Sequence, residues 1–132
     1  MSLYMLDTNS VSHLVRKHPK VARRLIARAP ASICISAVTE GELQYGLANR
    51  PKALQLRHIV DEFLKRVDVL PWDRAIAARY GLLRADLTRR GQTLAPLDLM
   101  IAAHALAIDA VLVSSDHAFA RVPGLVVEDW TA

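Results

Sequence analysis

LYMLDTNS, at residues 3–10, is a short apolar run that ends on a carboxylate. Residues 3–6 predict a strand, because consecutive apolar side chains fit a strand that is covered on both faces. Asp7 follows directly, although a charged side chain is costly to bury at the end of such a strand. Two interpretations are open: Asp7 or Asn9 caps the helix that follows, or Asp7 belongs to a functional site.

After this first strand, the rest of the chain alternates between predicted helices and predicted strands. Strands are predicted at 32–36 (SICIS), 67–70 (VDVL), 110–114 (AVLVS) and 125–128 (LVVE). Helices are predicted at 11–16, 20–28 (the two separated by Pro19), 38–50, 54–64, 76–87 and 96–108. Apolar strands joined by helices indicate a mainly parallel sheet of about five strands with both faces covered, which is a three-layer α/β/α sandwich.

Length and composition restrict the class of protein. The 132 residues predict one domain, residues 1–132, and a hydrophobic share of 52% excludes a disordered chain. No apolar run is long enough for a membrane span, and no signal peptide is evident. Cys34 has no disulfide partner in the chain and is expected to be an inert core thiol. These features favour a cytoplasmic protein, and the net charge of +4 with clustered arginines favours a polyanionic partner.

Four carboxylates follow the strand-to-helix rhythm. Asp7 ends the first strand and Asp116 follows the fourth, while Glu42 lies one turn into the helix after the second strand. Asp98 lies in the first turn of the very apolar helix that Pro96 opens. Ligands of open parallel sheets bind beyond the carboxyl ends of the strands, so these acids are expected to share one edge. Taken singly, each also fits a helix cap or a first-turn acid that complements the helix dipole.

Four clustered carboxylates would repel one another, by about 4 kcal/mol per pair at 4 Å and an effective dielectric of 20. No Lys or Arg lies beside Asp7, Asp98 or Asp116 in the sequence to offset that repulsion. Hard oxygen ligands without a neighbouring Cys or His pair favour Mg²⁺ or Mn²⁺ over zinc. An acidic metal pocket on a basic domain is typical of a metal-dependent phosphodiesterase.

Four sequence blocks carry a family resemblance. They are MLDTN (5–9), ELQYG (42–46), PLDLMIAAHA (96–105) and LVSSDHAFARVPGLVVEDW (112–130). In order and spacing they resemble the motif blocks of PIN-domain ribonucleases, and more narrowly the VapC toxins of bacterial type II toxin–antitoxin pairs. The resemblance runs from the first strand to the C-terminus, and the four blocks together are far more specific than any one of them.

The resemblance implies roles for individual residues. It assigns the acidic metal site to Asp7, Glu42, Asp98 and Asp116, and supporting positions to Asn9 and Ser114, for which a helix cap and a strand-end hydroxyl are the structural alternatives. Glu40 is an extra acid that the family pattern does not require. Arg84 fits a recurring position that would contact RNA or brace the site, with a solvated arginine as the alternative. His104 is expected to be a hydrogen-bonded core residue rather than a catalytic base, and Trp130 a packing residue.

The resemblance also implies an activity and partners. Such proteins are endoribonucleases that cut structured RNA such as tRNA, usually form homodimers, and are held inactive by a cognate VapB-like antitoxin that covers the acidic pocket. A non-catalytic RNA- or antitoxin-binding module with a structural metal is the alternative. A phosphatase-like enzyme with Asp7 as nucleophile is disfavoured, because Asn9 stands where its second aspartate is needed.

Overall fold

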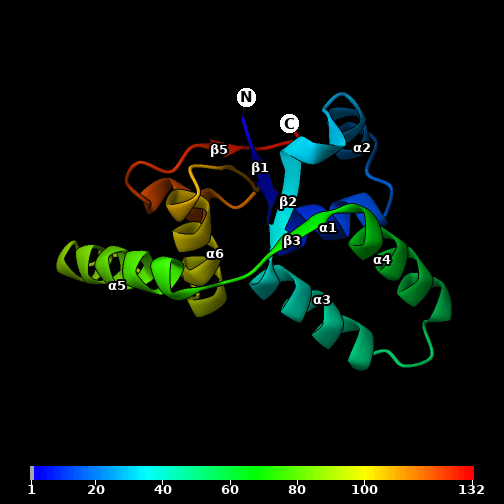
Figure 1. Ribbon diagram of the computed structural model, residues 1–132, viewed down its shortest axis with the longest axis horizontal. Coiled ribbons are helices and arrows are strands. Elements are labelled where there is room, and N and C mark those ends of the chain that lie inside the picture. Colours follow the sequence, from blue (N-terminus) through cyan, green and yellow to red (C-terminus); the bar gives the residue numbers. More distant parts are fainter. Residues whose placement is uncertain (1) are drawn as a thin grey trace.

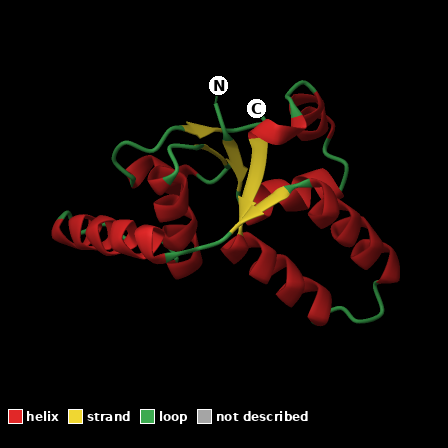
Figure 2. Ribbon diagram, in the orientation of Figure 1, coloured by secondary structure: helices red, strands yellow, loops and turns green. Residues whose placement is uncertain are grey.

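Five short parallel strands form the centre of the computed structural model, which describes residues 2–132 (Figures 1 and 2). The strands are β1 Tyr4–Leu6, β2 Ile33–Ser36, β3 Asp68–Leu70, β4 Val111–Val113 and β5 Val127–Glu128. Their order in the sheet is β3-β2-β1-β4-β5, and every pairing is parallel. The predicted parallel sheet of about five strands is confirmed.

Each predicted helix is present, with its ends shifted by a few residues. The α-helices are α1 Thr8–Val15, α2 Pro19–Ile26, α3 Ala37–Ala48, α4 Leu54–Arg66, α5 Arg74–Arg89 and α6 Pro96–Ala107, and the short 3-10 helices are η1 Pro30–Ser32 and η2 His117–Arg121. Pro19 does not simply separate two helices; it is the first residue of α2, a position where its missing N–H leaves no bond unmade. Within residues 2–132, no helix combines the length and apolar character needed to cross a membrane.

Successive strand residues point to opposite faces of the sheet, and the two faces have separate cores. Met5, Cys34 and Leu112 pack with the buried residues of α5, α6 and η2. Leu6, Ile35 and Val113 pack with α1, α2, α3 and α4. Helices therefore cover both faces, as Figure 1 shows, and the expected three-layer sandwich is confirmed.

Cys34 lies in the buried strand β2. Burial raises the pKa of its thiol to about 12, and the neighbouring Asp68 carboxylate acts in the same direction. The thiol is therefore protonated at neutral pH, in agreement with the inert core residue expected from the sequence.

The strand order places a switch point between β1 and β4. From β1 the chain runs outward through β2 to β3, and it then crosses to β4 on the other side of β1. The crevice beyond the carboxyl ends of two such strands is the usual binding site of an open α/β sheet. Here the Asp7 N–H donates to the carbonyl of Val113 over 3.1 Å, and Ser10 Oγ donates to the same carbonyl over 2.8 Å. The two strand ends are thus held tightly together below the crevice.

Candidate functional site

Asp7 is buried at the end of β1, with 3% of its surface exposed. Its Oδ1 accepts a hydrogen bond from the Ser10 N–H over 2.8 Å and so caps α1. Asn9 is not the cap, and it lies exposed in the first turn of α1. Capping occupies one carboxylate oxygen of Asp7, so the same side chain can serve both the helix and a site.

Asp116 follows β4 and begins η2. Its Oδ1 accepts from the Ala118 N–H over 2.9 Å, while its own N–H donates to Ser114 Oγ over 3.0 Å. Ser114 is buried and Asp116 is exposed. The hydroxyl of Ser114 therefore fixes the backbone that presents the Asp116 carboxylate at the mouth of the crevice.

Glu42 lies on α3 and is oriented by a residue that sequence analysis did not single out. Thr8 Oγ1 donates a hydrogen bond to Glu42 Oε1 over 2.5 Å, across 34 residues of chain. The only hint in the sequence was the position of Thr8 directly after Asp7. This contact joins the first turn of α1 to α3.

Asp98 is half-buried in the first turn of α6, and the negative charges of the three other acids act on it. Its pKa is raised to about 6, first by burial and then by the negative charges of Asp116, Asp7 and Glu42 in that order. Three carboxylates from three other parts of the chain therefore lie within range of the Asp98 charge. Glu42, and not Glu40, is among the charges that raise the pKa of Asp98.

No cation of the protein neutralises this cluster in the described residues. The ion pairs of residues 2–132 lie elsewhere: Arg28–Glu128, Lys65–Glu62, Arg89–Asp86 and Arg90–Asp86. Burying like charges without a partner destabilises a fold, so the arrangement is suited to an external cation.

Carboxylate oxygens are the type of ligand that Mg²⁺ and Mn²⁺ prefer, although these four carboxylates do not surround an ion on all sides. Within residues 2–132, no three His, Cys, Asp or Glu side chains converge closely enough to enclose an ion. Mg²⁺ keeps several of its water ligands and is commonly held by only one or two carboxylates, so an open acidic crevice suits it. Asp98, whose pKa is raised by its acidic neighbours, is the residue that such an ion would relieve most.

His104 lies in the core, as expected from the sequence. It has no exposed surface, and its Nδ1 is 2.7 Å from Ser36 Oγ. Ser36 also caps α3 by accepting from the Val38 N–H over 3.1 Å. Burial lowers the pKa of His104, while the more distant Asp73 acts weakly in the opposite direction. The imidazole thus ties the helix that carries Asp98 to the start of the helix that carries Glu42.

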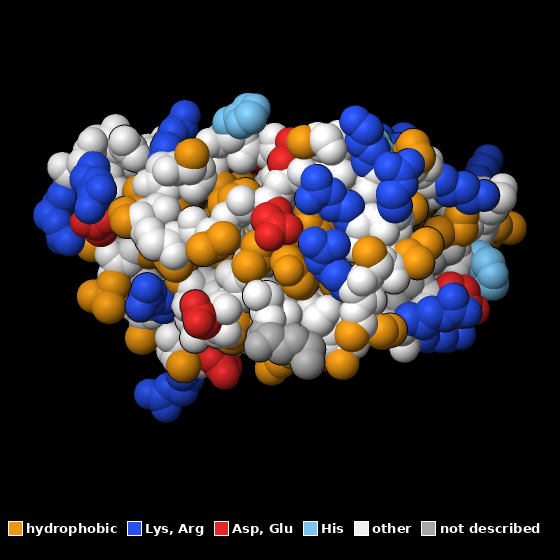
Figure 3. Space-filling view, turned by 90° about the horizontal axis from the view of Figure 1, so that it is seen from above, with side chains coloured by type: hydrophobic (Ala, Val, Ile, Leu, Met, Phe, Trp, Pro, Cys, Tyr) orange, Lys and Arg blue, Asp and Glu red, His pale blue; other side chains and the backbone are white. Residues whose placement is uncertain are grey.

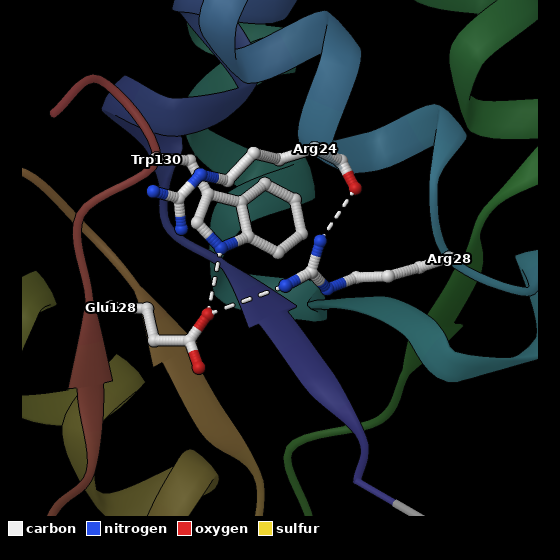
Figure 4. Close-up of polar contacts among 4 residues, drawn as sticks. All are labelled: Arg24, Arg28, Glu128 and Trp130. Atoms are coloured by element: carbon white, nitrogen blue, oxygen red, sulfur yellow. Dashed lines mark hydrogen bonds and ion pairs between the residues drawn. The ribbon is translucent and has the colours of Figure 1, made fainter.

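The basic residues near the start of the chain do not all face a partner. The Arg28 guanidinium lies 4.7 Å from the ring centroids of both Tyr4 and Trp130. It also pairs with Glu128 over 3.7 Å, and Figure 4 shows Arg28 with Trp130 and Glu128. Its Nη1 also donates to the Arg24 carbonyl over 2.7 Å. Because Tyr4 begins β1 while Asp7 follows its end, this cluster lies at the opposite edge of the sheet from the carboxylates. Trp130 is buried, which confirms its expected packing role.

Figure 3 views the molecule from the edge of the sheet where the chain begins. Lys and Arg side chains gather on the part of this face that holds α2 (compare Figure 1). The exposed Lys20 and Arg23 belong to α2. This group of positive charges therefore lies at the opposite edge of the sheet from the acidic crevice.

Arg84 is exposed on α5, and its Nη1 donates to Tyr80 Oη over 3.2 Å. It makes no hydrogen bond or ion pair with the four acids among the described residues. Any contact of Arg84 with RNA therefore remains a prediction.

A family model and several relatives match this chain. The PIN domain model matches residues 4–125. The tRNA(fMet)-specific endonuclease VapC of Shigella flexneri is 36% identical and covers 99% of this chain and 100% of its own length. Ribonuclease VapC2 of Rickettsia felis is also 36% identical, over 97% of this chain and 98% of its own length.

Solved structures with the same fold come from toxin–antitoxin complexes. The crystal structure of DNA-bound VapBC from Salmonella typhimurium matches with a TM-score of 0.90 and 34% identity, over 98% of this chain and 99% of that chain. VapBC2 from Rickettsia felis, bound to a DNA fragment from its promoter, matches with a TM-score of 0.88 and 34% identity, over 97% of this chain and 98% of that chain.

Proposed function

The chain belongs to the PIN-domain family, and within it to the VapC toxins, and on this premise we propose that it is a metal-dependent endoribonuclease that hydrolyses RNA phosphodiester bonds. It acts as the toxin of a type II toxin–antitoxin pair in the cytoplasm. Structured RNA is the proposed substrate, with tRNA the first candidate, because one relative is named a tRNA(fMet)-specific endonuclease.

One observation carries the catalytic part of the proposal: Asp98 lies among three other carboxylates, and no Lys or Arg of the described chain pairs with any of them. A purely structural role does not account for this arrangement, since only Asp7 and Asp116 cap helices. Asp98 and Glu42 cap nothing, and yet they are held close to the other two acids.

We assign the ion to Asp7, Glu42, Asp98 and Asp116, whose oxygens are the hard ligands that Mg²⁺ and Mn²⁺ prefer. When bound, the ion would supply neutralisation of the scissile phosphate and a more acidic attacking water. Thr8 orients Glu42, and Ser114 holds the backbone of Asp116. The supporting role proposed for Asn9 rests on the family resemblance alone, because its side chain is exposed.

We propose further that a VapB-like antitoxin covers the crevice, and that the toxin forms a homodimer. The solved structures of similar chains are complexes of this kind, which supports the antitoxin. A groove of about 260 Å³ begins at Thr8 and Glu42 and continues between α1, α3 and α4. Its apolar walls include Leu43, Leu47 and Val60, so a partner segment lying in it would also cover Glu42, the acid that lines the groove.

Gly46 tests this groove, because it lines the groove and has open space around its Cβ position. Gly46→Trp should fill the groove and weaken co-purification with a co-expressed VapB-like antitoxin. Gly81→Trp is the matched control, since Gly81 is another exposed helical glycine with open space but lies on α5. Equal antitoxin binding by both variants would place the partner elsewhere.

The test of the enzyme is cleavage of purified bulk tRNA with Mg²⁺ or Mn²⁺ and with EDTA. We expect cleavage with a metal, none with EDTA, and a large loss in Glu42→Gln. Glu40→Gln is the matched control, because Glu40 lies on the same helix turn without acting on Asp98. RNA binding without turnover under either metal would instead support the non-catalytic module.

A further inference from the structure

A cavity of about 220 Å³ lies between the C-terminal half of α5 and the first turn of α6. Pro96 and Leu99 line it, and Asp98 lies between them, so the cavity is within one helical turn of the carboxylate cluster. Its floor is apolar, with the buried Leu87 and the partly buried Leu94 beside Leu99. It is smaller than the roughly 300–1,000 Å³ of typical small-molecule sites, and therefore suits a single planar group.

The rim of this cavity is polar and carries a cation. Tyr80 and Arg84 line it from one face of α5, joined by their hydrogen bond of 3.2 Å. Arg89 and Arg90 at the end of the same helix both pair with Asp86. Arg84 has no carboxylate within ion-pair distance in the part of the chain that the structure describes. Its guanidinium is therefore available to an anion from outside the protein.

The cavity is held rigidly next to the acidic crevice. Arg121 Nη1 donates to the Thr93 carbonyl over 2.9 Å, which ties the loop between α5 and α6 to η2, the element that Asp116 begins. On the other side, Tyr80 packs edge-on against Trp72 with ring centroids 5.8 Å apart. The Trp72 Nε1–H in turn donates to the Met100 carbonyl of α6 over 3.0 Å. One wall is thus tied to the element that Asp116 begins, and the other to the helix that carries Asp98.

We propose that this cavity binds one unpaired nucleotide of the RNA substrate, next to the bond that is cut. The base would lie on the leucine floor beside the Tyr80 ring, and Arg84 would contact the adjoining phosphate. An apolar, ring-sized floor with one free cation at its rim is complementary to a nucleotide, whose base is planar and whose phosphate is anionic. The inference rests on the proposed ribonuclease function and deepens it by naming where single-stranded RNA is held.

The first test is steady-state cleavage of bulk tRNA by Tyr80→Leu and Arg84→Ala. Because both residues hold substrate away from the metal ligands, each variant should raise KM on the order of tenfold and leave kcat within about twofold. Arg89→Ala removes the same charge from the same helix outside the cavity, and should change neither constant by more than about twofold. Equal KM changes in Arg84→Ala and Arg89→Ala would mean only general attraction of RNA, and would overturn the subsite.

The second test does not need cleavage. Transcribed tRNA that contains 4-thiouridine is irradiated with the wild-type protein in EDTA. The cross-linked peptides are then identified by mass spectrometry. Cross-links within residues 80–94 support the subsite, and they would do so even if no metal produced cleavage and the ribonuclease function itself failed. Cross-links confined to other segments would overturn the subsite even in a protein that cuts RNA.

Discussion

The charged groups at the two ends of β1 have opposite kinds of neighbours. At its first residue, the Arg28 guanidinium lies over the rings of Tyr4 and Trp130 and also meets the Glu128 carboxylate. Beyond its last residue, Asp98 meets only other carboxylates among the described charged groups, and its pKa is raised to about 6 as a result of burial and those charges. The two clusters are separated by a strand of three residues.

The difference separates stability from function. A charge surrounded by compensating partners contributes to the fold, and its removal should be felt there. A group of like charges without partners reduces stability, and such clusters are typical of functional sites, where a ligand supplies the missing charge. Substitutions at the two ends should therefore have opposite consequences for catalysis and stability.

The largest expected effect is on catalysis at the acidic end. Asp98→Asn keeps the size of the side chain but removes a charged metal ligand, which forfeits several kcal/mol of charge stabilisation in the transition state. Cleavage of bulk tRNA should fall by about 10³-fold or more at saturating Mg²⁺ or Mn²⁺. The circular dichroism spectrum should stay that of the wild type. A folded Asp98→Asn protein with undiminished cleavage would remove Asp98 from the proposed mechanism.

The next effect is on stability at the basic end. Arg28→Ala loses two cation–π contacts and the ion pair with Glu128, so the free energy of unfolding should fall by about 2 kcal/mol. Urea unfolding measures this loss, and Tm should fall by about 7 °C. Cleavage by the folded protein should remain within about twofold of the wild type.

Two variants control for Arg28. Arg28→Lys keeps the charge but not the planar group that lies over the two rings, so it should recover only part of the lost stability. Arg23→Ala removes an exposed charge from α2 and should change the free energy of unfolding by less than about 0.5 kcal/mol. If Arg23→Ala and Arg28→Ala lowered the free energy of unfolding equally, the contacts of Arg28 with the two rings would not be what stabilises the fold.

A smaller effect concerns the pH dependence of the metal-free protein. The pKa of Asp98 is raised from 3.8 to about 6, so the folded state binds more protons than the unfolded state between these values, and stability falls as pH rises through them. Asp98→Asn should therefore stabilise the protein in EDTA by about 1–2 kcal/mol at pH 8, after allowance for solvent screening, and by only about a third as much at pH 4.5. An equal gain at both pH values would show that charge repulsion is not the cause.

Much of the fold followed from the sequence. Consecutive apolar residues at 3–6 and 110–114 indicated buried parallel strands, and Pro96 marked the first residue of the most buried helix. The carboxylates were assigned to one edge because strands and helices alternate, and residues directly after parallel strands must share that edge. Local pattern and topology were therefore sufficient for the layers and for the position of the crevice.

The contacts that depend on packing could not be predicted in the same way. The Thr8–Glu42 and His104–Ser36 hydrogen bonds join residues that are 34 and 68 positions apart, and no local pattern pairs a hydroxyl with a distant side chain. Arg28 looked like part of a basic surface segment, because its stacking partners lie at the two far ends of the chain. Such pairs depend on how the helices pack against the sheet in the folded protein.

The smallest effect comes from the second titratable group on α6 and has the opposite sign to that of Asp98. Burial lowers the pKa of His104 below 6.5, so the unfolded state gains a proton first as pH falls, and stability is lost on acidification through this range. To remove the opposing change at Asp98, we would compare Asp98→Asn with Asp98→Asn/His104→Asn in EDTA. Between pH 7.5 and 5.5 the free energy of unfolding of the first should fall more than that of the second, measured by urea unfolding. His104→Asn keeps a group that can bond to Ser36, so a parallel pH dependence in the two proteins would mean that His104 is not held neutral by the core.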